Sequence, residues 1–264
     1  MTTTTTEHRS TKAIALRPRS TVAVAVAVVA GLMAFCWPLL VADGSVLAEN
    51  VLAPLILGSL LPVVLAVVLF EISEGGLDPK AVAMLGVLAA IGAAIRPLGA
   101  GTAGIETVFF LLILGGRVFG AGFGFVLGAT TLFGSALFTG GVGPWLPYQM
   151  IGAAIVGLLA GLLPPLRGRL ELAMLAAYGL VAGLLYGILM NLSFWPYSLG
   201  RSTGISFVAG DAITENLHRF LVFEFTTSLG WDLVRGITNV VLILVTGPAI
   251  LGTLRRAARK AAFR

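Results

Sequence analysis

Three polar residues near the end of the sequence are spaced so that they share one helical face. Asp232, Arg235 and Asn239 lie three and then four positions apart within an apolar segment, a spacing that places them on the same side of an α-helix. Ionisable side chains in such a segment are costly and usually mark a pathway or a site. We favour a face that lines a binding site; the alternative is an Asp232–Arg235 pair that only holds helices together. Trp231 beside them adds a ring that could stack on a ligand or anchor at a membrane surface.

A second group of candidate residues lies in the turn Thr139–Met150, which reads TGGVGPWLPYQM. Its glycines permit backbone angles that other residues resist, and its prolines fix theirs. The turn should therefore hold Trp145, Tyr148 and Gln149 rigidly between two apolar segments. Two aromatic rings and an amide are suited to binding a small solute that is both polar and aromatic.

Several kinds of chemistry have no residues to support them. The chain contains no GxxxxGK[ST] phosphate-binding loop, GxSxG elbow or HExxH pair. Cys36 is the single cysteine, and the two histidines, His8 and His218, are far apart, so neither an intrachain disulfide nor a metal site is expected. We expect no enzyme activity and no cofactor. Glu106, at the end of an apolar segment, is interpreted as a side chain that reaches toward water.

The composition predicts that helices crossing a membrane position these residues. The chain is 58% hydrophobic and 11% charged, with a mean hydropathy of +1.00, whereas a soluble domain is about one quarter charged. Apolar runs near the roughly 20 residues needed to cross the hydrocarbon recur along it. The predicted fold class is an all-α, polytopic membrane helical bundle of about eight spans: Ser20–Leu40, Val51–Glu71, Lys80–Ile95, Thr107–Gly116, Gly122–Phe138, Pro147–Leu163, Leu170–Leu192 and Thr226–Leu251.

The basic residues predict the orientation. If the N-terminus is cytoplasmic and the spans alternate, 13 of the 17 lysines and arginines fall on the cytoplasmic side, which is the bias of membrane proteins. We therefore expect a multi-pass protein of the cell (plasma) membrane with both termini cytoplasmic. The net charge of +5 then reflects orientation and anionic lipid, and not nucleic acid.

The predicted organisation has four parts. Residues 1–19 form a disordered cytoplasmic tail, 20–79 an accessory two-helix hairpin, 80–254 a six-helix module and 255–264 a basic cytoplasmic tail. The hairpin and the module are separated by the composition break Ser73–Lys80, and no repeat of inverted halves is evident.

Small residues recur at four-residue spacing and form smooth stripes along the predicted helices. Such stripes let helices approach closely in lipid, and packing within the chain is the favoured interpretation for most of them. The stripe of Gly86, Ala90 and Ala94, on the first helix of the module, is the exception that we expect to face a partner. Other stripes are Gly116/Gly120/Gly124/Gly128, Gly157/Gly161 and Gly179/Gly183/Gly187.

The segment Ser193–Phe225 is predicted to be external and is long for a connection. Its second half, Asp211–Phe225, has the pattern of an amphipathic helix capped by Asp211, with Ile213, Leu217, Phe220 and Leu221 on the apolar face. Two interpretations are open: a helix lying at the membrane interface, or a lid over the site.

Lys80–Leu254 resembles the substrate-binding (S) component of energy-coupling factor (ECF) vitamin transporters of the actinobacterial type. The resemblance rests on the alanine-rich opening helix, on the Gly116–Met150 stretch with GPWLPYQ, and on SLGWD with the following arginine and TN in the last span. It covers about two thirds of the chain; the two N-terminal spans depart from the six-helix pattern.

The resemblance implies a vitamin-like substrate, cobalamin being one candidate, bound from outside, together with a transmembrane coupling subunit and two cytoplasmic ATPases. It also implies that Gly86, Ala90 and Ala94 contact the coupling subunit. The substrate would be bound by the outer loops and outer helix halves, which adds Arg96 to the candidates already named: Trp145, Tyr148, Gln149, Trp231, Asp232, Arg235 and Asn239. Two other functions remain open, a stand-alone proton-coupled permease for small solutes and a structural membrane protein that transports nothing.

Overall fold

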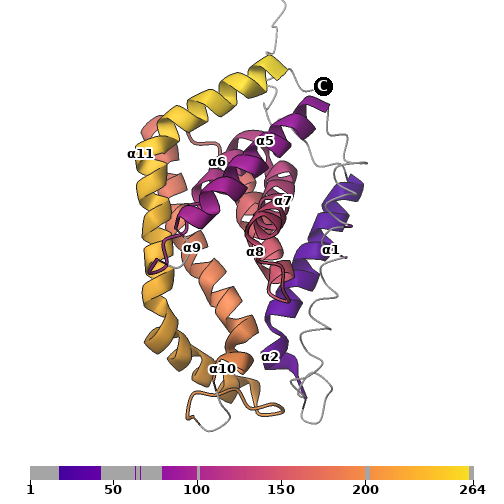
Figure 1. Cartoon of the computed structure of the whole chain (residues 1–264), viewed down its shortest axis with the longest axis vertical. Coiled ribbons are helices and arrows are strands. Elements are labelled where there is room, and N and C mark those ends of the chain that lie inside the picture. Colours follow the sequence, from indigo (N-terminus) through magenta and orange to yellow (C-terminus); the bar gives the residue numbers. More distant parts are fainter. Residues whose placement is uncertain are drawn as a thin grey trace, which may run out of the picture.

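The computed structural model describes residues 18–42, 63, 66, 79–99, 102–199 and 203–261. Within these ranges every regular element is helical (Figure 1). The elements in chain order are α1 Pro18–Phe35, α2 Trp37–Leu40, α5 Pro79–Ile95, the 3-10 turn η1 Arg96–Leu98, α6 Phe109–Phe119, α7 Ala121–Thr139, α8 Leu146–Leu162, α9 Gly168–Ser198, α10 Ile213–Phe223, the π-helical turn η2 Glu224–Ser228 and α11 Leu229–Ala261.

The helices agree with a helical membrane protein. Four of them are long and apolar enough to cross a membrane: Pro79–Leu98, Ala121–Thr139, Gly168–Ser198 and Ile213–Ala261. Three shorter apolar helices, Thr21–Phe35, Phe109–Phe119 and Leu146–Leu162, lie at other predicted spans. The predicted span Val51–Glu71 falls almost wholly outside the described residues, so the total of eight stays a prediction.

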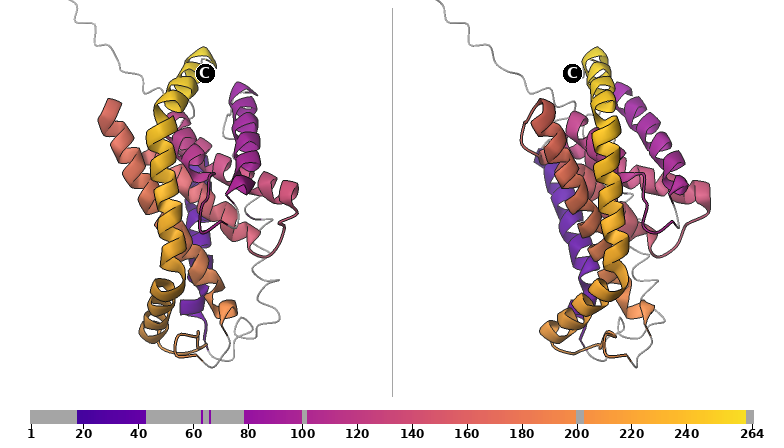
Figure 2. Two further views of the ribbon diagram at one scale, coloured as in Figure 1. Left: turned by 60° about the vertical axis from the view of Figure 1, so that its left-hand side comes forward. Right: turned by 90° about the vertical axis from the view of Figure 1, so that its left-hand side faces the viewer.

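Two long helices form one side of an elongated molecule. α9 and α11 run antiparallel and pack along most of their length, while α10 and η2 close one end (Figures 1 and 2). α7 and α8 form the closest-packed pair in the interior, with α6 against both and α5 across α7. These contacts join the six predicted module helices into one bundle.

The interior helices approach through glycine. A methyl group at Gly124 of α7 would overlap the carbonyl oxygen of Gly157 of α8, and one at Gly116 of α6 would meet the same oxygen. Gly128 lies equally close to the backbone at Ala153. The stripes on α6, α7 and α8 therefore pack within the chain, as their spacing predicted.

The first helix is fixed to this bundle. Gly31 of α1 lies against the Ile151 side chain of α8, and the rings of Phe35 and Tyr148 meet edge to face with centroids 5.2 Å apart. In α2, directly after α1, the Trp37 indole nitrogen donates to the carbonyl oxygen of Ser193 on α9 at 3.1 Å. The first half of the predicted accessory hairpin thus contacts α8 and α9 directly.

The predicted amphipathic helix exists as α10, but its capping and its apolar face differ from expectation. Ala212 occupies the N-cap position, and Asp211 instead pairs with Arg219 at 2.7 Å, which lowers the pKa of the Asp211 carboxyl. Phe220 is buried, whereas Ile213, Leu217 and Leu221 are exposed. The buried face is shifted because Phe220 and Phe223 pack with Leu192 and Trp195 at the end of α9.

Basic residues from separate segments meet at the end of the molecule opposite α10. Arg117 and Arg255 both pair with the buried carboxylate of Glu171, at 2.7 and 2.6 Å. The Lys80 ammonium donates to the carbonyl oxygen of Ala261 at 2.9 Å, so the start of α5 and the end of α11 are joined. All three basic residues belong to the segments that the sequence assigned to the cytoplasmic side.

Gly124→Ala should lower the stability of the bundle, because its methyl group has to displace the backbone of Gly157. Overpacking of this kind costs about 1–3 kcal/mol, measured as a lower midpoint of thermal unfolding in detergent. Gly86→Ala is the matched control, since it is also within a helix but has no atom within 4 Å of the added methyl group. Equal midpoints for the two variants would contradict the packing argument.

Candidate functional site

Arg235 is the centre of a charged network inside the bundle. Its Nε donates to Glu106 Oε2 at 2.7 Å, and its Nη1 donates to Asp232 Oδ1. The guanidinium also lies over the Tyr186 ring, 5.5 Å from the centroid. Only 13% of the Arg235 side chain and 2% of the Asp232 side chain are exposed. The cation is therefore largely withdrawn from solvent and neutralised by two carboxylates from different parts of the chain.

Glycines on α9 make room for this network. A methyl group at Gly183 would overlap the backbone of Gly236, and one at Gly187 would occupy the space of the Asp232 carboxyl. The predicted glycine stripe of α9 therefore packs directly against the predicted polar face of α11 that carries Asp232 and Arg235. The close approach lets Asp232 and Arg235 lie against the backbone of α9 instead of lipid.

Two further residues extend the network toward α10. Asn191 Nδ2 donates to Glu224 Oε2 at 2.9 Å and to Asp232 Oδ2 at 3.4 Å. Glu224 lies in the π-helical turn η2 and is 4% exposed. One amide group therefore bridges two buried carboxyl groups.

A second polar group forms where α5 ends. Arg96, in η1, donates through Nη2 to Gln149 Oε1 at 3.2 Å and through Nη1 to Ser135 Oγ at 3.4 Å. These contacts connect the end of α5 with α7 and with the first turn of α8. The structure thus brings together Arg96, from one predicted outer loop, and Gln149, from the predicted turn Thr139–Met150.

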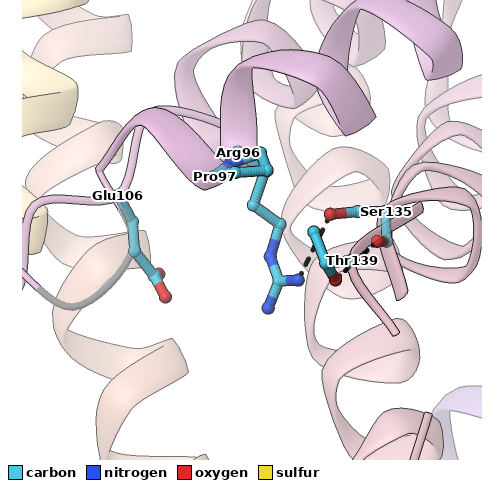
Figure 3. Close-up of a pocket in the computed structure, with 5 residues that line it drawn as sticks. All are labelled: Arg96, Pro97, Glu106, Ser135 and Thr139. Atoms are coloured by element: carbon cyan, nitrogen blue, oxygen red, sulfur yellow. Dashed lines mark hydrogen bonds between the residues drawn. The ribbon is translucent and has the colours of Figure 1, made fainter. Parts of the chain in front are cut away.

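A cavity of about 140 Å³ lies between the two groups. Figure 3 shows the Arg96 guanidinium and the Glu106 carboxylate directed into the same space, with Ser135 and Thr139 beyond them. Pro97 completes the lining. Because Glu106 also binds Arg235, a single carboxylate connects the cavity to the α11 network.

The other predicted site residues lie elsewhere. Tyr148 is fully buried, with Phe35 and Phe194 at 5.2 and 5.8 Å, so a solute ring has no access to it in this structure. The Trp145 indole lies over Gly143 and donates to the Gly141 carbonyl oxygen at 3.1 Å, which fixes the turn itself.

On α11, Asp232 and Arg235 belong to the network, whereas Asn239 and Trp231 do not. Asn239 is buried and donates to the Gly179 carbonyl oxygen at 3.1 Å, where it joins α11 to α9. Trp231 is half exposed. Neither residue lines the cavity.

Sequence reasoning missed the residues that complete the site. Glu106 was interpreted as reaching toward water, yet it pairs with Arg235. Ser135 gave no signal of its own, because its partner Arg96 is far away in the sequence. One signal was present for Glu224: it lies eight positions before Asp232, close to two full turns of one continuous helix.

Comparisons of the chain with protein-family models, with curated proteins and with solved structures found no match. What defines the site is therefore its own geometry: a charged cavity within an all-helical bundle of the membrane type.

Arg235→Met should destabilise the protein strongly, because it leaves Asp232 and Glu106 without their cation. Removing one partner of a buried ion pair costs about 3–5 kcal/mol, which thermal unfolding in detergent would report. Arg256→Met on the same helix is the control, since Arg256 is exposed and bonds only to Thr253 among the contacts described. If the two variants had the same midpoint of thermal unfolding, the network around Arg235 would not stabilise the protein.

Proposed function

We propose that this chain binds a small polar solute inside the membrane and serves as the substrate-binding component of an ECF-type importer. The observation that carries the proposal is the cavity between Arg96 and Glu106. A cavity lined by a few fixed charged groups, within an otherwise apolar bundle, is a common form of small-ligand site.

The cavity residues indicate the chemistry of the ligand. Arg96 would bind a carboxylate, a phosphate or a carbonyl oxygen, and charge-assisted bonds of this type are the stronger ones. Glu106 would accept hydrogen bonds from an amine or a hydroxyl group, and Ser135 and Thr139 offer hydroxyl groups. The ligand would thus carry both acceptor and donor groups.

Both charged side chains are held in place before a ligand arrives. Gln149 and Ser135 orient Arg96, and Arg235 orients Glu106. Side chains that are already positioned lose less entropy on binding, which favours affinity.

The size of the cavity limits the ligand. At about 140 Å³ it is smaller than the roughly 300–1,000 Å³ of sites for drug-sized molecules. It suits a compact micronutrient or the polar end of a larger one. Enclosing a whole cobalamin would require the cavity to open.

Two cytoplasmic ATPases would supply the energy through a transmembrane coupling subunit, since this sequence has no nucleotide-binding loop of its own. The face of α5 that carries Gly86, Ala90 and Ala94 is exposed, while Leu85, Leu88 and Gly92 pack inward. Gly86 has no atom within 4 Å of an added methyl group. A smooth, exposed helix face supports the proposal that the coupling subunit docks here, with two ATPases bound to that subunit on the cytoplasmic side.

A stand-alone proton-coupled permease is the second candidate, and the buried carboxyl groups of Asp232 and Glu224 favour it. Intramembrane carboxyl groups are typical of proton relays. Uptake by vesicles that contain only this chain, driven by a pH gradient, would support the permease. Uptake that requires the coupling subunit and ATP would support the importer.

Arg96→Met should abolish retention of the ligand. A hydrogen bond to a charged group is worth about 1.5–3 kcal/mol, so affinity should fall roughly ten- to hundredfold. Mass spectrometry of small molecules extracted from the purified chain would show a compound present with the wild type and lost from the variant. Arg169→Met, at an exposed position at the start of α9, is the control; the same compounds in both variants would refute the site.

Ala90→Leu should prevent co-purification with the coupling subunit while leaving ligand retention intact, because the added volume disturbs only the exposed face of α5. Ala177→Leu, at an exposed position on α9, is the matched control and should leave the complex intact. A complex that survives Ala90→Leu would place the docking surface elsewhere.

A further inference from the structure

The junction between α10 and α11 contains two carboxyl groups that the proposed binding of a solute does not use. Glu224 begins the π-helical turn η2, and Asp232 lies in the first turn of α11. π-Helical turns within α-helices often mark functional positions. The two side chains are 4% and 2% exposed.

These two carboxyl groups share their surroundings. The Asn191 Nδ2 donates to both, to Glu224 Oε2 at 2.9 Å and to Asp232 Oδ2 at 3.4 Å, so a single amide nitrogen holds the two carboxyl groups side by side. Glu224 Oε1 is buried and has no hydrogen-bond donor among the described residues. An ionised carboxyl group only accepts hydrogen bonds, so two of them placed side by side in a buried site are favourable only when one holds a proton.

The positive charge nearby is too small to neutralise the cluster. Arg235 is the cation that acts on Glu224, and it is already paired with both Glu106 and Asp232. Even when Arg96 of the cavity is counted with Arg235, three carboxyl groups facing two guanidinium groups leave an excess of negative charge when all are ionised. Two carboxylates in one buried site cannot both ionise freely, and the usual outcome is a single shared proton.

A proton fits this site better than a metal ion. The Asp232 carboxyl lies directly against the backbone of Gly187, where even a methyl group has no room. Within the described ranges, no group of three or more His, Cys, Asp or Glu side chains is arranged to hold a metal ion. The remaining way to neutralise the pair is protonation.

We propose that Glu224 and Asp232 form a buried proton-binding site in which the two carboxyl groups share one proton, held mainly by Glu224. Asp232 is the member of the pair that binds Arg235. The proton comes from water and returns to water, so no other reactant is needed. This inference does not depend on which solute the cavity binds.

The position of the site gives the proton an effect on the cavity. When Glu224 loses the proton, its carboxylate adds a second full negative charge beside that of Asp232. This charge draws the Arg235 guanidinium toward η2. Arg235 then holds Glu106 less firmly at the cavity lining. Five charged or titratable groups face this network from α9, α11, η1 and the segment before α6: Tyr186, Asp232, Arg235, Arg96 and Glu106. The groups of α10 do not face it: Glu215 and His218 are exposed, and Arg219 pairs with Asp211.

Infrared spectroscopy of the full-length chain in detergent tests the proposal directly. A protonated carboxyl group has a C=O stretch that is separate from the bands of carboxylates and that shifts in D2O. The wild type should show this band at pH 7 and lose it as the pH is raised. A wild-type spectrum without the band at pH 7 overturns the proposal, whatever happens to the variants.

Three variants assign the band. Glu224→Gln should abolish it, and Glu215→Gln, which removes an exposed carboxylate on α10, should leave it unchanged. Asp232→Asn should shift the band, because the partner of Glu224 becomes an amide. A band that persists in Glu224→Gln, or one unaltered in Asp232→Asn, shows that the two groups do not share a proton.

Discussion

A guanidinium buried among apolar helices has to be neutralised where it lies, and the arrangement of the site follows from this constraint on Arg235. Its two carboxylate partners come from the same helix and from the segment before α6. Satisfying both fixes the Glu106 segment against α11. Because Glu106 also lines the cavity, its ion pair with Arg235 fixes where the cavity carries negative charge.

Close helix packing makes this arrangement possible. Gly183 and Gly187 bring the backbone of α9 within contact of α11, and Gly124 and Gly157 do the same for α7 and α8. In lipid, where apolar surfaces gain nothing by leaving their surroundings, such contacts gain dispersion energy from close approach. The interior helices thus form a rigid wall from which Ser135 and Thr139 face the cavity.

Much of this fold was predictable from hydrophobic runs and residue spacing. Seven of the predicted spans correspond to helices, and the small-residue stripes identified the contacts between them. The site was only partly predictable: the spacing of Asp232 and Arg235 indicated their shared face, but not the partners of either residue. Glu106 and Ser135 could not be assigned because their roles depend on contacts across many positions. Tyr148 misled for a physical reason, since a tyrosine at a turn packs inward when neighbouring rings such as Phe35 offer it a buried site.

The Arg235 network joins two features that are separate in the sequence. The cavity is lined by opposite charges, and the carboxyl pair at η2 lies on the same network, so the proposed binding and the proposed protonation would act on common residues. The most direct test of the central claim is a structure of the full-length chain purified from cells in a lipid nanodisc. We predict density for a compact polar molecule between the Arg96 guanidinium and the Glu106 carboxylate. A cavity closed by direct Arg96–Glu106 contact, or filled by an acyl chain, would contradict the claim.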